Sequence, residues 1–215
     1  MNKHAKKNRF LKEFLTISSK KGCNLDVYKE TIKKLKYNPN DLDKLFPAKI
    51  DDLILYYNFI INEKLSNNFK KKKFNKKSVR LCILNAVKIR FELLNSNKES
   101  IKKSLIFFSN PSKQILSSKL IYKTVDYIWK LIGDKSTDYN FYTKRAILAS
   151  IYSFATVVWI SDKSNNLDKT FNFLEKSIMN MNIVTNIKEK LKKTLNQILY
   201  RIFSYFITLF FSIIF

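Results

Sequence analysis

The chain has 215 residues, 46% of them hydrophobic, and it contains only two glycines and three prolines. This composition is too apolar for wholesale disorder and too poor in turn residues for a turn-rich all-β fold, so it predicts an all-α domain with a buried core. The formal charge of +24 is compatible with nucleic acid or an anionic membrane as a partner, but an AT-rich coding bias toward lysine, asparagine and isoleucine explains it equally well.

Few residues could support catalysis or bind a metal. His4 is the sole histidine and lies in a polar tail, and Cys23 and Cys82 lack the spacing of a metal site, so we expect reduced thiols. Gly22 and Gly133 cannot build a glycine-rich phosphate loop. The N-terminus has no apolar signal core, so we expect no secretory export. We therefore expect no catalytic residue, no metal site and no cofactor.

Residues 1–67 predict three short helices and a longer fourth, a helix-turn-helix-like unit. The expected helices are Phe10–Ile17, Leu25–Leu35 with Asn24 as its cap, Asn40–Phe46 and Ile50–Leu65. This is the N-terminal layout of regulators of the TetR type, and the Leu45–Leu53 stretch resembles the segment that links their third and fourth helices. A DNA-binding transcriptional regulator is therefore one hypothesis.

Residues 68–181 predict a helical bundle that begins with a polar loop, Asn67–Lys77. The expected helices are Ser78–Leu94, Ile101–Phe108, Ser112–Ile132, Asp138–Ile160 and Asn166–Met181. Asp138–Ile160 is apolar nearly all round, as in a central helix or in one that lines an apolar cavity. The candidate cavity residues are Phe107, Phe108, Tyr122, Ile151, Tyr152 and Trp159. The alternative is a solid core without a ligand.

The corner between the two longest helices of this bundle is rich in aromatic residues and cations. Gly133 is placed to end the preceding helix with a positive φ, and Ser136, Thr137 and Asp138 are candidate N-caps of the next one. Asp134 and Asp138 are more consistent with capping groups than with a catalytic dyad. The candidate partner-binding residues are Ile128, Ile132, Asp138, Phe141 and Tyr142, because buried interface centres favour aromatic anchors. The alternative is that Phe141 and Tyr142 pack inside.

Residues 182–215 predict a membrane-associating helix. Its first half is basic, and residues 202–215 carry no charge. That uncharged run spans about 21 Å as a helix, which is shorter than the roughly 30 Å hydrocarbon core. We therefore expect a helix at the membrane surface, with cations at the headgroups and rings at the acyl boundary. The candidate membrane-binding residues are Lys188, Lys192, Arg201, Phe203, Phe206 and Phe210. The alternative is a core helix.

The stretch Lys123–Arg145 closely resembles the family of coenzyme Q biosynthesis protein nine. That family shows threonine-valine-aspartate, a tryptophan, and then glycine-aspartate-x-serine-threonine-aspartate-x-asparagine-tryptophan-tyrosine-threonine-lysine-arginine. Phe141 stands in place of the second tryptophan, which removes an indole N–H. Further elements of the family pattern are matched by three other stretches, Trp159–Ser164, Thr170–Leu174 and Leu45–Pro47. The resemblance therefore covers about residues 9–180.

The resemblance implies a TetR-like helical fold without gene regulation. It implies a lipid-binding homodimer that presents isoprenoid quinone intermediates to the demethoxyubiquinone hydroxylase at the membrane, as a non-enzymatic accessory protein of ubiquinone biosynthesis. By resemblance, the five candidate partner-binding residues form the hydroxylase contact. We expect a protein of the bacterial cytoplasm, peripheral on the inner membrane, or alternatively one on the matrix side of the mitochondrial inner membrane.

The DNA-binding alternative shares this fold, so the fold cannot distinguish the two hypotheses. The charge of the helix that would enter the major groove can distinguish them. That helix carries Asp41 and Asp43 and one lysine, although Lys33, Lys34 and Lys36 lie nearby. A recognition helix sits among phosphates and normally brings positive charge. We therefore expect no sequence-specific binding of nucleic acid.

Overall fold

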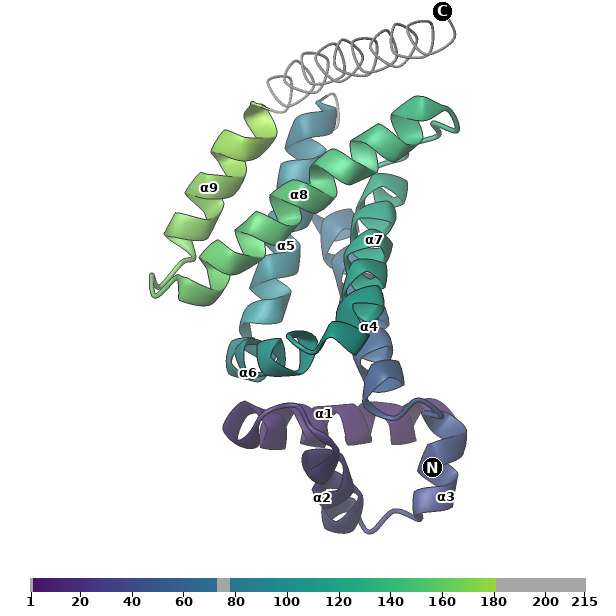
Figure 1. Ribbon diagram of the computed structural model, residues 1–215. Helices are drawn as coiled ribbons and strands as arrows, with labels where there is room; N and C mark the ends of the chain where they lie inside the picture. Colours follow the sequence, from purple (N-terminus) through teal and green to yellow (C-terminus); the bar gives the residue numbers. More distant parts are fainter. Residues whose placement is uncertain (1, 73–77, 181–215) are drawn as a thin grey trace, which may run out of the picture.

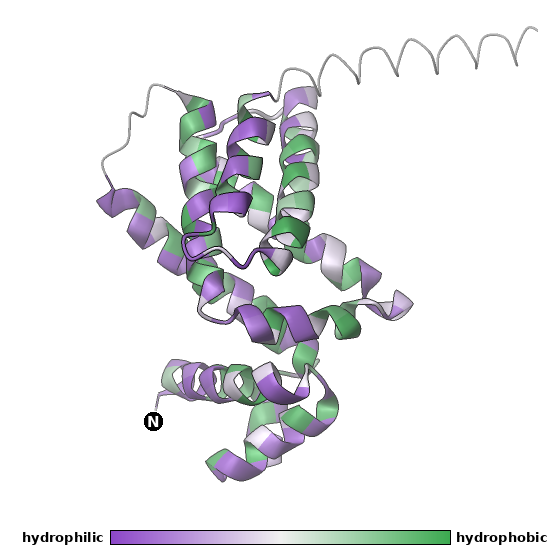
Figure 2. Cartoon of the chain, turned by 90° about the vertical axis from the view of Figure 1, so that its left-hand side faces the viewer, coloured by the Kyte–Doolittle hydropathy of each residue, from purple (hydrophilic) through white to green (hydrophobic). Residues whose placement is uncertain are grey.

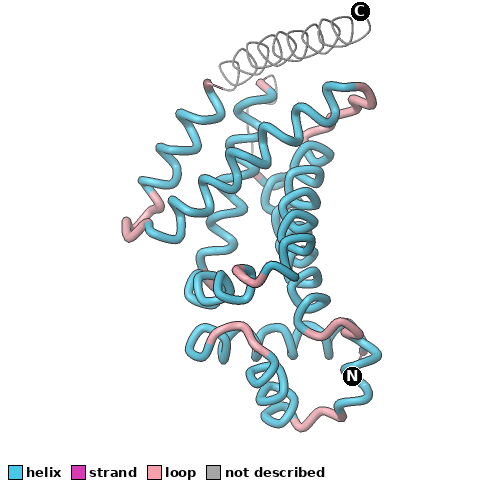
Figure 3. Tube along the Cα trace, viewed as in Figure 1, coloured by secondary structure: helices cyan, strands magenta, loops and turns pink. Residues whose placement is uncertain are grey.

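The computed structural model describes residues 2–72 and 78–180. Within these two ranges the chain forms nine α-helices, one short 3₁₀ helix and no strand, with short connecting loops (Figure 3). The all-α prediction is confirmed, and the arrangement is consistent with a TetR-like bundle. The predicted membrane-associating segment, residues 182–215 with Lys188, Lys192, Arg201, Phe203, Phe206 and Phe210, lies outside the described residues.

The first three helices form a small unit with its own apolar cluster. They are α1 (Lys3–Lys21), α2 (Leu25–Leu35) and α3 (Pro39–Leu45), shown at the bottom of Figure 1. Phe10, Leu42 and Phe46 are at most 1% exposed at the centre of this cluster. Helix α1 is longer than predicted, because the polar residues that flank its apolar stripe are helical too. Helix α2 begins where predicted, since the Asn24 side chain accepts a hydrogen bond from the backbone N–H of Val27.

The fourth helix, α4 (Ile50–Lys71), connects this unit to the bundle above it (Figure 1). Its first turns contribute Ile50 and Leu53 to the N-terminal cluster, and its later turns contribute Ile61 and Leu65 to the larger cluster of the bundle. The helix runs six residues past the predicted end at Leu65, so part of the predicted polar loop is helical. The boundary predicted at residue 67 therefore falls inside α4.

The bundle consists of α5 (Val79–Asn95), α6 (Lys98–Phe108), η1 (Pro111–Lys113), α7 (Gln114–Leu131), α8 (Tyr139–Ser161) and α9 (Asp168–Met179). In Figure 1, α8 crosses the front of the bundle, α9 lies beside it, and α6 lies at the base, where it packs on α1. Apolar residues run in patches along the helices with polar residues between them (Figure 2). The larger core cluster gathers buried residues from α4, α5, α7, α8 and α9.

The turn after α2 has a lysine at a position that usually takes glycine. Lys36 ends α2 in the left-handed conformation, with φ of 53°. Glycine is the usual residue at such a helix end because it has no Cβ to oppose a positive φ. The chain nevertheless closes the turn, since the backbone N–H of Tyr37 donates to the carbonyl of Ile32.

Candidate functional site

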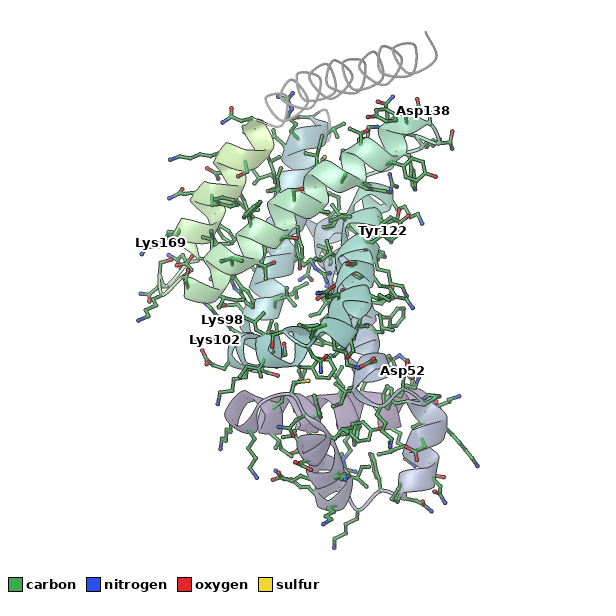
Figure 4. The ribbon with its side chains drawn as sticks, in the orientation of Figure 1. Asp52, Lys98, Lys102, Tyr122, Asp138 and Lys169 are labelled. Atoms are coloured by element: carbon green, nitrogen blue, oxygen red, sulfur yellow. The ribbon has the colours of Figure 1, made fainter. Side chains whose placement is uncertain are left out.

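The corner between α7 and α8 is closed by two local backbone motifs. Gly133 adopts φ of 88°, its N–H donates to the Lys130 carbonyl, and the N–H of Asp134 donates to the Trp129 carbonyl. This pair of bonds forms a Schellman motif, and the positive φ of Gly133 at the helix end is confirmed. Asp138 then caps α8, because its carboxylate accepts the backbone N–H of Asn140 at 3.0 Å. Asp138 lies at the tip of the corner (Figure 4).

A buried ion-pair network holds the corner together. The Arg145 side chain is 4% exposed, its Nε lies 2.7 Å from Asp126 Oδ1 on α7, and one of its terminal nitrogens lies 3.1 Å from Asp134 Oδ2. The same guanidinium donates to the Phe141 carbonyl and stacks on the Phe141 ring, 3.4 Å from its centroid. The motif thus uses Arg145 to tie the end of α7 to the first turns of α8.

Asp134 is the second centre of this network and does not act as a helix cap. It accepts hydrogen bonds from Lys144 at 2.8 Å and from Ser136, in addition to the contact with Arg145. Burial of its carboxyl raises the pKa, but the hydrogen bonds from Lys144, Ser136 and Arg145 outweigh burial and lower the pKa from 3.8 to about 2. Asp134 is therefore a fixed anion at neutral pH with a structural role.

The candidate partner-binding residues divide into exposed and buried ones. Tyr142 is 68% exposed, and its ring meets the half-buried Phe141 edge to face at 5.1 Å between centroids. Asp138 is exposed and Ile132 is half-buried. Ile128 is fully buried, which corrects its expected place in a surface patch. It faces the core because it lies on the inner face of α7 together with Val125.

A groove between α7 and α8 continues from this corner. Its lining includes Tyr122 and Val125 of α7 and Tyr142, Ala146 and Phe154 of α8. Tyr122 is 49% exposed and Phe154 is 66% exposed. This placement corrects the expectation that Tyr122 lines the internal cavity.

A cavity of about 320 Å³ lies at the junction of the bundle and the N-terminal unit. Of the six predicted lining residues, Phe108, Tyr152 and Trp159 line it. Phe107 instead packs against the N-terminal cluster beneath the ammonium group of Lys113, and Ile151 is buried in the core. An α-helix that is apolar all round has no polar face to indicate which residues meet the cavity, so these two assignments were wrong.

The cavity wall also extends beyond the predicted helices of residues 78–160. Helix α1 contributes Phe14, and α4 contributes Leu53 and Ile61. Cys23 lines it too, and burial together with the charge of Asp51 raises the pKa of its thiol to about 12. Cys23 and Cys82 are both free thiols, as predicted, and both are buried. The wall is therefore mostly aliphatic and aromatic, with contributions from both structural units.

One side of the cavity is polar, which the sequence pattern did not predict. Arg90 of α5 is 3% exposed and donates to Asn58 and Asn62 of α4, to Thr124 Oγ1 of α7 at 3.2 Å and to Tyr152 Oη of α8 at 3.0 Å. Arg90 and three of these partners line the cavity. The signal that could have found this site is the pair of asparagines at i and i+4 on the inward face of an apolar helix.

The stretch Trp159–Ser164, which resembles another element of the family pattern, also has a structural role. Asp162, which ends α8, accepts hydrogen bonds from the backbone N–H and hydroxyl of Ser164 and of Thr170. Burial raises the pKa of Asp162, but these four hydrogen bonds outweigh it and keep the pKa well below the ordinary range. Asp162 therefore joins α8 to the start of α9.

Neither a metal cluster nor a spanning helix is found in the described ranges. No three histidine, cysteine or acidic side chains gather there in a way that could hold a metal ion. Among residues 2–72 and 78–180, no helix is both long and apolar enough to cross a membrane.

Comparison with known proteins gives a family match in the C-terminal half. Residues 115–185 match the model of the COQ9 family. Among curated proteins, the chain is 36% identical over 99 residues to human "Ubiquinone biosynthesis protein COQ9, mitochondrial", an alignment that covers 45% of this chain and 31% of the relative. It is 30% identical over 121 residues to a probable ubiquinone biosynthesis protein coq9, mitochondrial, of Dictyostelium discoideum, covering 54% of this chain and 39% of the relative. The chain thus spans between 31% and 39% of the length of these two relatives.

Proposed function

We propose that this chain belongs to the COQ9 family, whose model residues 115–185 match, and that it is a non-enzymatic lipid-binding protein of ubiquinone biosynthesis. In this proposal it takes an isoprenoid or quinone lipid into the cavity between the bundle and the N-terminal unit. It then presents that lipid to the demethoxyubiquinone hydroxylase at a membrane surface.

The cavity is the observation that carries this proposal. Its volume of about 320 Å³ falls within the range of small-molecule sites, roughly 300–1,000 Å³. Aliphatic and aromatic side chains make up most of the wall, and an apolar chain needs few polar groups to bind there. Phe108, Tyr152 and Trp159 are the predicted lipid-binding residues that remain in this role.

The corner between α7 and α8 is the proposed hydroxylase contact. Tyr142 is accessible in the free protein, and the ion pairs of Arg145 hold the backbone that presents it. An exposed aromatic residue on a preorganised backbone loses little conformational entropy on binding. Phe141, Ile132 and Asp138 would surround this anchor.

The proposal extends to the assembly and the location of the protein. We propose a homodimer that contacts a membrane through residues 182–215. The curated relatives are named as mitochondrial proteins, which supports the matrix side of the mitochondrial inner membrane over a bacterial inner membrane. The comparisons give no support to the DNA-binding alternative. Asp41 of α3 also forms an ion pair with Lys6, so this lysine is not a free cation for a DNA phosphate.

Mass spectrometry of lipids that co-purify with the protein from a ubiquinone-making host tests the lipid proposal. We expect an isoprenoid lipid with the wild-type chain and loss of that lipid with Leu120→Trp, because the indole would occupy the cavity that Leu120 lines. The matched control is Lys119→Trp, which places the same side chain at the exposed neighbouring position and should retain the lipid.

Two outcomes would contradict this proposal. One is wild-type protein that yields no more isoprenoid lipid than an unrelated protein purified from the same host. The other is equal lipid recovery from the Leu120→Trp and Lys119→Trp variants when both are folded.

A further inference from the structure

Arg90 is a buried cation in the wall of an otherwise apolar cavity. Its side chain is 3% exposed, and an arginine keeps its charge throughout the physiological pH range. Transferring a charge out of water is costly unless an opposite charge compensates it. The groups that lie next to the Arg90 guanidinium therefore determine which ligands the cavity can bind.

Within the described part of the chain, Arg90 has hydrogen-bond acceptors as partners but no negatively charged group. The four acceptors are the side-chain oxygens of Asn58 and Asn62 and the hydroxyls of Thr124 and Tyr152. All four are neutral, whereas Arg145, the other arginine that is buried among the described residues, lies between the carboxylates of Asp126 and Asp134. The two sites show that this fold pairs one buried arginine with anions and leaves the other with neutral partners.

The rest of the cavity wall does not compensate the charge either. The described residues that line it include no aspartate and no glutamate, and Arg90 is the one charged side chain among them. The guanidinium has five N–H groups, and four hydrogen bonds to Asn58, Asn62, Thr124 and Tyr152 use four of them. One donor and the full positive charge are thus left for a molecule inside the cavity.

We propose that the cavity binds an acidic amphiphile, with its carboxylate against Arg90 and its hydrocarbon chain along the apolar wall. This inference rests on the proposed lipid-binding function, and it narrows the ligand from an isoprenoid or quinone lipid in general to a lipid that carries an acidic head group. A carboxylate supplies both the missing negative charge and an acceptor for the remaining N–H, and charge-assisted hydrogen bonds are the stronger kind. A quinone head group would supply carbonyl oxygens without the charge.

Fluorescence titration of the full chain with cis-parinaric acid and with its methyl ester tests this inference. The two probes share one hydrocarbon chain, and at about pH 8 only the acid is anionic. We expect the acid to bind at least about tenfold more tightly than the ester, since the ester cannot compensate the guanidinium. Because this comparison uses the wild-type protein, it does not depend on the folding of any variant.

Arg90→Met should bring acid binding down to the level of the ester and leave the ester unaffected. Lys119→Met is the control, because it removes an exposed cation of α7 outside the cavity and should keep the preference for the acid. Equal binding of acid and ester by the wild type, or a preference that persists in folded Arg90→Met, would overturn the role of Arg90 while leaving a lipid cavity in place. Binding of neither probe would overturn the lipid-binding function itself.

Discussion

At the scale of single residues, the family motif serves mainly to hold a corner in place. Asp134 accepts hydrogen bonds from Lys144, Ser136 and Arg145, and it thereby connects the end of α7 to the beginning of α8. Its side chain is 6% exposed and that of Arg145 is 4% exposed. Removing one partner of such a pair leaves the other charge uncompensated away from water, which costs more than the pair itself contributes.

Asp134→Asn should lower the free energy of unfolding by about 3 kcal/mol, because it leaves Arg145 without one of its two carboxylates. It should also change the pH dependence. The folded-state pKa of about 2 lies below the ordinary 3.8, so the carboxylate stabilises the fold above the ordinary value and loses this effect as the pH falls through about 2. Denaturant unfolding from neutral to acidic pH measures both effects.

The matched control is Asp138→Asn, four residues along the same corner. Asparagine is as good an N-cap as aspartate, and Asp138 has no ion pair in the described structure, so stability should change by less than about 0.5 kcal/mol. Similar destabilisation by the two substitutions would show that the corner depends on its caps rather than on the ion-pair network.

At the scale of elements, α7 and α8 together present an apolar groove that continues from this corner. Tyr122, Tyr142 and Phe154 line it and are all at least 49% exposed. Exposed aromatic residues gathered between two helices are typical of interaction surfaces. Because Tyr142 is 68% exposed, its side chain can be truncated with little effect on the core.

Tyr142→Ala should weaken binding of the proposed partner, the demethoxyubiquinone hydroxylase, by about 2 kcal/mol or more, as for an interface anchor, with little change in thermal stability. Affinity measured by co-purification or calorimetry, together with a melting curve, checks both parts. The control is Phe59→Ala on α4, which truncates another exposed aromatic residue away from the groove. If the Tyr142→Ala variant binds the hydroxylase with unchanged affinity, or if it does not fold, the proposed role of Tyr142 in the interface is contradicted.

At the scale of the whole molecule, α4 and the cavity join two apolar clusters into one structure. Ile50 and Leu53 belong to the N-terminal cluster, and Ile61 and Leu65 of the same helix belong to the cluster of the bundle. Helix α1 also packs on α6, where the hydroxyls of Ser18 and Ser100 form a buried hydrogen bond. We expect the described part of the chain to unfold as one cooperative unit.

Phe10→Ala tests this cooperativity, because Phe10 is fully buried in the N-terminal cluster and does not line the cavity. The substitution should cost about 3–5 kcal/mol. Trp129 and Trp159, the two tryptophans of the chain, both lie in the cluster of the bundle. Tryptophan fluorescence and circular dichroism should therefore show the same shifted midpoint. A tryptophan transition that stays at its wild-type position would show that the two clusters unfold independently.

The amino-acid sequence by itself determined the features that depend on neighbouring residues. Gly133 and Asp138 end α7 and begin α8 as predicted, and Asn24 caps α2, because these interactions involve backbone groups only a few residues away. The order of residues in Lys123–Arg145 was likewise enough to indicate the family. The packing of the helices, in contrast, decided which residues reach the cavity.

Tertiary structure alone decided the burial of Ile128 and Ile151, the part of α1 and α4 in the cavity wall, and the position of Arg90. In the sequence, an arginine within an amphipathic helix is indistinguishable from a solvent-exposed cation. Its acceptors come from α4, α7 and α8, at sequence separations of 28 to 62 residues. Only the folded chain brings these groups together, because their contacts depend on how whole helices pack and not on any local pattern.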